Sequence, residues 1–237
     1  MNLQHFMTIL TISLILTSVT GMTQENNEIM LPTPRMDSDF SLEKAMQMRR
    51  SVREYSPSAI SLEELSQLLW ACQGISGSVS FQNEGKTVTI DLRTAPSAGA
   101  LYPLEVFIVV SRIEGLDAGI YHYKPGSKDK SHSLVRVQSG DKGYELSQAA
   151  LGQDCIKNAA VSFVIGAYVE RTSKKYGERA EQYVLIEAGH AGQNLCLQAQ
   201  AFNIGTVTVG AFHEDKVAKL LNTDSRPVYM ICCGKKK

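Results

Sequence analysis

The chain has 237 residues, and its 24 Lys and Arg are balanced by 24 Asp and Glu, so the formal net charge is zero. Zero net charge argues against a general binder of nucleic acids or of anionic membranes, because both classes usually carry a clear basic excess. The length and the 43% of hydrophobic residues are enough for one globular domain with a sizeable core. Any site for an anion must therefore be local.

The first 21 residues predict a signal peptide. Residues 6–21 form an apolar run that ends in small residues, and it is shorter than the ~20 apolar residues of a membrane-spanning helix. Val19 and Gly21 suit cleavage after Gly21, although His5 stands ahead of the run in place of the usual Lys or Arg. We therefore expect export to the periplasm, with no stable membrane association after cleavage. A cytoplasmic protein and an uncleaved N-terminal membrane anchor are the alternatives.

The rest of the chain predicts alternating helices and strands. The two prolines of LPTPR make residues 22–38 an extended linker, so that the domain covers residues 39–237. A capping box of Ser61 and Glu64 marks the start of the second helix. The expected elements, in chain order, are helices over 41–50 and 61–74, a loop with one short strand over 76–94, strands over 103–111, 119–127 and 132–141, a helix over 143–151, a strand over 159–169, one long helix over 176–202, a strand over 205–212, a helix over 213–222 and a strand over 227–234.

Two features of this pattern bear on packing. The strands over 103–111 and 159–169 are almost wholly apolar, so we expect both of their faces to be buried. The helix over 176–202 is apolar around much of its circumference, which predicts a central position or an interface. The interleaving of strands and helices indicates one domain of the α/β or α+β class.

The signatures of several other enzyme classes are incomplete. The Gly-Lys-Thr of NEGKT lacks the earlier glycine of a phosphate loop, since that position is Ser80, and GISGS fails the hydrolase pattern GxSxG at Ser78. Glu187 and His190 are spaced as two metal ligands but have no evident third, so we expect no metal site and a hydrogen-bonded core histidine. The cysteines show no CxxC pair and no metal spacing, and we expect buried apolar thiols at Cys72, Cys155, Cys196, Cys232 and Cys233.

Positive charge is concentrated in MRRSVREYS, directly after the first predicted helix. Arg49, Arg50 and Arg53 surround Ser51 there, and an arginine side chain can bind phosphate oxygens through two parallel hydrogen bonds. The end of a helix presents partial negative charge, so arginine side chains and not backbone amides would have to bind an anion at this place. A solvated basic turn is the alternative, because charge runs are commonly surface features.

Two later segments leave their backbone uncovered. In RTAPSAGALYP, residues 93–103, the small residues at 97–100 let a flat ligand approach closely and leave N–H groups free to donate. A tight loop ahead of a strand is the alternative for this segment. In GTVTVGAF, Gly210 and Ala211 follow a strand end, which is a usual place for sites in α/β folds.

Taken together, these segments resemble the FMN-dependent nitroreductase family, and within it the SagB-type dehydrogenase branch. RRSVREYS resembles the family's phosphate motif, APSAGALYPLEVFIVV resembles the flavin-ring loop of the branch, and IGTVTVGAF resembles the last flavin loop. GIYHYKP with HSLVRV resembles the middle hairpin of the branch, and KKYGERAEQYVLIEAGHAGQNLCLQA resembles its long helix. The resemblance runs from Ser41 to Gly234, with the motifs in the family's order.

The resemblance implies an α+β, nitroreductase-like three-layer fold, in which helices flank a central mixed, mainly antiparallel sheet. It also implies an intertwined homodimer with FMN bound noncovalently at the subunit interface. The arginine segment would hold the phosphate, the ribityl chain and the pyrimidine edge, and the two loops would line the ring. Carried over residue by residue, the implied cofactor-binding residues are Arg49, Arg50, Ser51, Arg53, Pro96, Ser97, Gly99, Leu101, Val209, Gly210 and Ala211.

The resemblance further implies chemistry that FMN carries out while the protein supplies position and electrostatics. NAD(P)H would deliver hydride to the flavin N5, and an electron-poor nitroaromatic, quinone or activated alkene would then accept two electrons. In azoline-oxidising members of the branch a Lys-Tyr pair abstracts the proton, and Lys175 with Tyr176 is the candidate pair here. An ordinary helix start is the alternative for that pair. An azoline dehydrogenase acting on modified peptides and a non-catalytic FMN-binding or carrier protein are the alternative functions.

Overall fold

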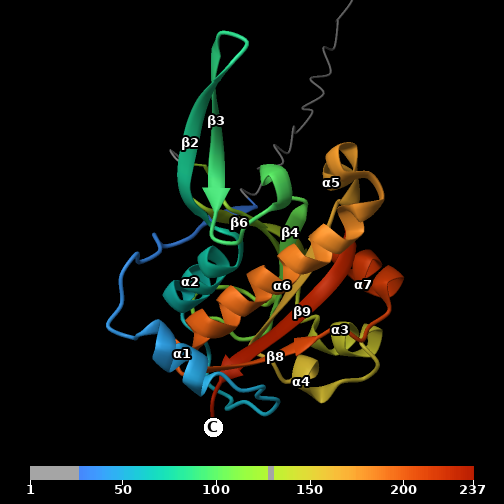
Figure 1. Ribbon diagram of the computed structural model, residues 1–237. Coiled ribbons are helices and arrows are strands. Elements are labelled where there is room, and N and C mark those ends of the chain that lie inside the picture. The colour runs from blue at the N-terminus through green and yellow to red at the C-terminus, as the bar shows by residue number, and fades with distance from the viewer. Residues whose placement is uncertain (1–26, 128–130) are drawn as a thin grey trace, which may run out of the picture.

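The computed structural model describes residues 27–127 and 131–237 (Figure 1). The predicted signal peptide over residues 1–21 falls outside this range and stays a prediction. No helix within the described range is both long enough and apolar enough to cross a membrane. Within the same range no group of three His, Cys, Asp or Glu side chains is placed to hold a metal ion.

A seven-stranded sheet forms the centre of the domain. Each of its six neighbouring pairs is antiparallel, and the spatial order is β1-β6-β5-β4-β7-β9-β8. The strands are β1 (Glu28–Met30), β4 (Leu104–Val110), β5 (Gly119–Lys124), β6 (Ser133–Ser139), β7 (Val161–Ala167), β8 (Ile204–Val209) and β9 (Arg226–Lys235). A sheet of this kind flanked by helices confirms the α+β class.

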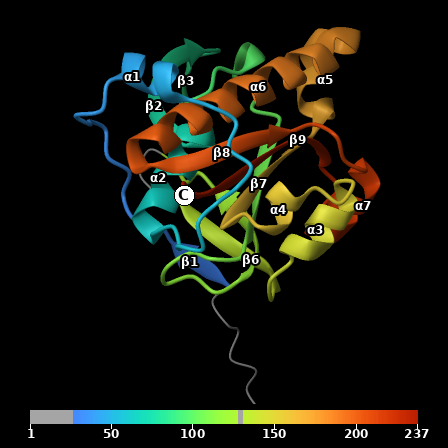
Figure 2. The same ribbon diagram turned by 90° about the horizontal axis from the view of Figure 1, so that it is seen from below.

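Helices cover both faces of this sheet, which gives three layers (Figure 2). One face carries α1 (Leu42–Met48), α2 (Leu62–Gln73), α5 (Val169–Tyr176) and α6 (Ala180–Gln198), and the other carries α3 (Gly143–Ala149), α4 (Asp154–Lys157) and α7 (Glu214–Leu221). Short 3₁₀ helices lie at Ala98–Ala100, Gly177–Arg179 and Ala199–Phe202. Of the helices, α6 lies diagonally across the sheet and packs on α2, α5 and β9.

The central strands divide their side chains between two cores. In β4, Val106 and Ile108 belong to the core under α2 and α6, whereas Phe107 and Val109 belong to the core under α3, α4 and α7. This alternation follows from the two-residue period of a strand. Both faces of β4 and β7 are buried, as their apolar sequences predict.

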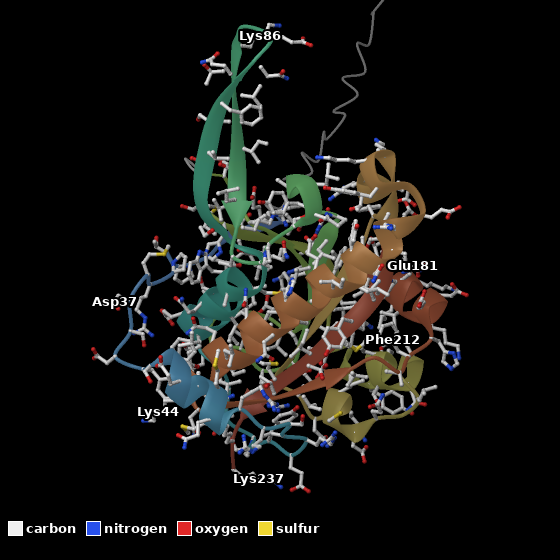
Figure 3. All side chains as sticks on the ribbon, viewed as in Figure 1. Asp37, Lys44, Lys86, Glu181, Phe212 and Lys237 are labelled. Atoms are coloured by element: carbon white, nitrogen blue, oxygen red, sulfur yellow. The ribbon has the colours of Figure 1, made fainter. Side chains whose placement is uncertain are left out.

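A two-stranded hairpin replaces the predicted loop and single strand over 76–94. Strands β2 (Ile75–Asn83) and β3 (Lys86–Arg93) pair with each other and project from the domain, with Lys86 near the tip (Figure 3). Glu84 and Gly85 form the turn, both with positive φ, as a two-residue hairpin turn requires. Because Glu is a rare residue at the first of these positions, the turn gave no clear signal and the prediction was wrong.

The long helix predicted over 176–202 is present but begins later than expected. Gly177 ends α5 with φ 55° and ψ −132°, a conformation outside the helical region, and α6 begins only at Ala180. The helix over 169–176 was not predicted: residue 169 was assigned to the preceding strand, residues 170–175 were assigned to no element, and residue 176 was assigned to the long helix. Lys175 and Tyr176 therefore end α5 and do not begin the long helix.

Part of the predicted linker over 22–38 belongs to the domain. Strand β1 pairs with β6 at the edge of the sheet, and Leu31 is buried in the core. The Pro32 carbonyl lies 2.9 Å from Nε2 of the buried His132, which also contacts Ser66 and Tyr123. A three-residue strand is too short to be recognised from its pattern, and its partner lies about a hundred residues away.

The segment after α1 lies along the edge strand β8 of the sheet. Ser51 forms a parallel bridge with Thr206, and the Val52 amide donates to the Thr206 carbonyl at 2.8 Å. Gly205 and Gly234 permit this approach, because an added Cβ would stand 2.7 Å from the Val52 side chain and 2.5 Å from the Tyr55 ring, respectively. These two glycines therefore leave room for the segment to lie this close to the sheet.

Replacing Gly234 with alanine is expected to destabilise the domain by roughly 1–3 kcal/mol, because the new methyl group overlaps the buried Tyr55 ring. Urea unfolding followed by circular dichroism measures the change. Gly77→Ala is the matched control, since a Cβ there meets nothing within 4 Å and should change stability by about 0.5 kcal/mol or less. Equal stability of the two variants would contradict this account of the packing.

Candidate functional site

The arginine segment presents two guanidinium groups without carboxylate partners. Arg50 donates to the carbonyls of Gln47 and Arg49 at 2.9 and 2.8 Å, so part of its hydrogen-bonding capacity is used on the last turn of α1. Within the described residues no carboxylate lies within 4.0 Å of Arg49 or Arg53. Those two side chains, together with the exposed Ser51, remain available to an anion.

The edge strand β8 brings a second predicted segment to the same side of the sheet. Ser51 pairs with Thr206 in the middle of β8, and Val209, Gly210 and Ala211 follow at its end. Gly210 and Ala211 are exposed, and the Ala211 carbonyl accepts a hydrogen bond from the Gln153 side chain at 3.1 Å. Two of the three predicted cofactor segments therefore share one edge.

The loop over 96–101 is wound around Ser97. The Ser97 carbonyl accepts from the Ala100 amide at 3.1 Å, and its hydroxyl accepts from the Tyr102 amide at 2.9 Å. Gly99, Ala100 and Tyr102 all have positive φ, at 64°, 53° and 46°. For residues other than glycine this conformation costs on the order of 1–3 kcal/mol and is found mostly at functional sites.

The amides of Ala98, Gly99 and Leu101 make no hydrogen bond within the described chain. The exposed Pro96 and Gly99 leave this stretch of backbone open. The loop therefore offers N–H donors to a ligand, as its small residues predict.

Lys175 and Tyr176 meet this loop. A Cβ atom added at Gly99 would stand 2.9 Å from the Tyr176 hydroxyl and 3.0 Å from Lys175 Nζ, so both polar groups lie against the glycine backbone. Arg171 on the same helix binds Glu105 at 2.7 Å and donates to the Tyr102 carbonyl at 3.1 Å. These contacts hold α5 beside the loop.

Two carboxyl groups near the loop have pKa values that are shifted in opposite directions. Burial alone would raise the pKa of Glu105, but hydrogen bonds from His122 and Arg171 outweigh it and bring that pKa to about 2. Burial raises the pKa of Glu187 to about 7, while the Ser97 hydroxyl and the charge of Arg93 oppose this rise. Glu105 is therefore ionised at neutral pH, whereas Glu187 titrates there.

Sequence reasoning missed the roles of Arg93, Arg171 and Glu187 at the loop, because each reaches it from a separate element. It also misjudged His190, which was expected in the core but is exposed on α6, whereas Glu187 three residues earlier is buried. The five cysteines are buried free thiols, which confirms that prediction.

The three predicted segments do not all meet within one chain. Arg49 lies close enough to Cys196, near the end of α6, for its charge to act on that thiol. The loop over 96–101 instead lies beside Glu187, nine residues and roughly 13 Å earlier along the helix. Within the described residues no hydrogen bond or ion pair joins the arginine segment or the β8 end to this loop.

Two known proteins are similar in sequence to this chain. The chain is 38% identical over 209 residues to the protein MJ1384 of Methanocaldococcus jannaschii, a nitroreductase by name, and the match covers 88% of this chain and 96% of that one. It is 31% identical over 147 residues to the microcin B17-processing protein McbC of Escherichia coli, which covers 57% of this chain and 50% of that one. The chain thus spans about half the length of the toxin-processing relative.

Solved structures share the fold. A nitroreductase-named protein of Anabaena variabilis has a TM-score of 0.68 at 29% identity, over 83% of this chain and 38% of that one. One of Ralstonia eutropha has a TM-score of 0.71 at 24% identity, over 89% and 90% of the two chains. The NADPH:FMN oxidoreductase of Vibrio harveyi has a TM-score of 0.56 at 16% identity, over 83% and 69%.

The family model described as "Nitroreductase family" matches residues 46–235, which includes the arginine segment, the loop over 96–101 and the end of β8. This match spans most of the chain, and it agrees with the antiparallel sheet flanked by helices and with the relative that is similar over nearly its whole length. The chain belongs to the nitroreductase family.

Proposed function

We propose that this chain is an FMN-dependent oxidoreductase that passes two electrons from NAD(P)H to an electron-poor acceptor such as a nitroaromatic, a quinone or an activated alkene. The observation that carries the proposal is the open backbone of the 96–101 loop, with free amides and with Lys175 and Tyr176 against Gly99. A flat ring that bears hydrogen-bond acceptors fits such a surface. The family and the NADPH:FMN oxidoreductase among the structural neighbours support the cofactor.

The residues at the other end fit a phosphate. Arg49 and Arg53 have no carboxylate within 4.0 Å among the described residues, and Ser51 lies exposed between them. A phosphate monoester carries close to two negative charges, which two guanidinium groups can neutralise through charge-assisted hydrogen bonds. We propose that these residues bind the phosphate and that Arg50 contributes mainly by fixing the end of α1.

FMN, when bound, supplies the two-electron chemistry. The chain's own residues would bind and orient it: the loop amides donate to ring acceptors, and the exposed Gly210 and Ala211 leave room at the end of β8. The hydroxyl of Tyr176 and the amino group of Lys175 are placed to hold or move a proton at the loop. No other acid or base is required for hydride transfer.

We propose that two copies of the chain complete the site. The arginine segment and the loop lie at different places along α6, and this helix exposes Leu185 and Ile186 at 47% and 49%. In a homodimer the arginine segment of one copy and the loop of the other could meet across these apolar side chains. Analytical ultracentrifugation should find a dimer, and a monomer that still binds FMN would contradict this arrangement.

Oxidation of azolines in a modified peptide is a second candidate function. It is favoured by the contact of Lys175 and Tyr176 with Gly99, and by the similarity to a microcin-processing protein. A protein that stores or carries FMN without turnover is a third, and its distinguishing property is FMN binding with no electron transfer to any acceptor.

Arg49→Ala and Arg53→Ala are each expected to weaken FMN binding by about 1.5–3 kcal/mol, or roughly 10- to 150-fold, because each removes a charge-assisted hydrogen bond. Quenching of FMN fluorescence on binding measures the dissociation constant. Lys44→Ala is the control, since Lys44 is an exposed cation on α1 (Figure 3) and its amino group lies over the Phe40 ring. Unchanged affinity for FMN in both arginine variants would contradict the phosphate site and support a solvated helix end.

Lys175→Ala separates the first two functions. If the pair acts as a base on azolines, oxidation of a thiazoline peptide should fall by about 10²- to 10⁴-fold while FMN stays bound. Reduction of a quinone by NAD(P)H needs no such base and should change by less than about threefold. Lys174→Ala, in the preceding exposed position, is the matched control. An equal loss of both activities would contradict a base role.

A further inference from the structure

The carboxyl group of Glu187 is enclosed behind the 96–101 loop. The residue is 3% exposed, and its Oε1 atom is buried without a hydrogen-bond partner among the described residues. It faces inward from α6 with Val184, Ala188 and Ala191, all of which are buried. An ionised carboxylate with an unfilled oxygen is costly in such surroundings, so the enclosure favours the neutral acid.

The groups that face Glu187 come from two neighbouring elements. Arg93 at the end of β3 supplies a positive charge, and the Ser97 hydroxyl of the loop, which packs on α6, acts to lower the pKa of Glu187. The Arg93 guanidinium is occupied with Gln73 of α2 at 2.8 Å and lies 4.9 Å from the centre of the Tyr102 ring. It makes no ion pair within 4.0 Å with Glu187, and Nε2 of the buried Gln73 also lacks a partner.

These opposing influences leave the protonated and ionised forms of the Glu187 carboxyl close in free energy near neutral pH. Burial raises the pKa of Glu187 to about 7, and the partners at Ser97 and Arg93 keep the rise from being larger. Glu105, the other acid that acts on Arg93, is held ionised by His122 and Arg171. Glu187 is therefore the carboxyl of this cluster whose charge can change at neutral pH.

Ser97 connects this proton to the loop. Its hydroxyl oxygen already accepts from the Tyr102 amide, and the hydroxyl hydrogen is free to rotate. By rotation about its own C–O bond, the hydroxyl can turn its hydrogen toward a Glu187 carboxylate or away from the neutral acid.

We propose that Glu187 acts as a positioning residue from behind the loop, and that its carboxylate would take up a proton when a flavin held at the loop gains negative charge. This inference rests on the proposed function. One O–H bond forms at the carboxylate with a proton from the solvent, and the same bond breaks when the ring is oxidised again. The electrons come from the donor that reduces the ring, which is dithionite in the test below.

The first test is the pH dependence of the flavin midpoint potential in the FMN-loaded protein. Between about pH 7 and 8.5, the potential of the wild type should fall more steeply with pH than that of Glu187→Gln, because the variant has no carboxyl to protonate. Glu181→Gln, an exposed position on the same helix, should keep the wild-type slope. Parallel slopes for the wild type and Glu187→Gln would overturn the inference while leaving FMN binding intact.

The second test needs no cofactor. A carboxyl whose pKa is raised on folding is protonated in the native state and ionised in the unfolded state between the two pKa values. The stability of the wild-type apoprotein should therefore fall relative to Glu187→Gln as the pH rises from about 4.5 to 7, and the difference should be constant above that. Urea midpoints for both proteins measure it.

The outcomes separate the two proposals. A difference in stability that does not vary with pH would overturn the inference, whether or not FMN binds. Failure of the protein to bind FMN would instead overturn the proposed function and, with it, the inference. Because glutamine matches glutamate in shape and needs no proton, the variant is expected to fold at every pH used.

Discussion

The need to cover two apolar faces of one sheet determines most of this structure. Strands β4 and β7 are buried on both sides, so helices must pack on each face, and the connections between strands and helices must pass around the ends of the sheet. This constraint places α6 across one face and leaves the 96–101 loop and the end of α5 at the same end of that helix (Figure 1). The candidate site is therefore built from segments that the core has already fixed.

Burial of polar groups follows from the same arrangement. Glu187 and Arg93 are drawn beneath the loop by elements whose positions are set by apolar contacts, and they approach each other without forming an ion pair. Burying ionisable groups without direct pairing costs free energy that an apolar core would not. The two groups lie next to Ser97, in a loop where Ala100 and Tyr102 have positive φ angles. The cost of burying them therefore falls at the loop that is proposed to hold the flavin ring. Strain and buried charge are concentrated at one place, as is common at functional sites.

Local sequence patterns were sufficient to predict the strands of the core and to find the motifs that identify the family. The apolar runs of β4 and β7 and the capping box at Ser61 needed no knowledge of their neighbours. The hairpin of β2 and β3 was missed because Glu84 is unusual at a turn position that requires positive φ, and α5 was missed because no helix was assigned directly ahead of residue 176. The contact of Lys175 with Gly99 joins residues 76 positions apart, and no local pattern encodes such a contact.

The proposed function requires this chain to bind FMN and to use it for electron transfer. The decisive experiment is the anaerobic addition of NADH or NADPH to the purified, FMN-loaded protein. A bound flavin band at about 450 nm should bleach on addition of one of the two donors and return when a quinone is supplied. A protein that takes up no FMN, or whose flavin band persists with both donors, would contradict the proposed function.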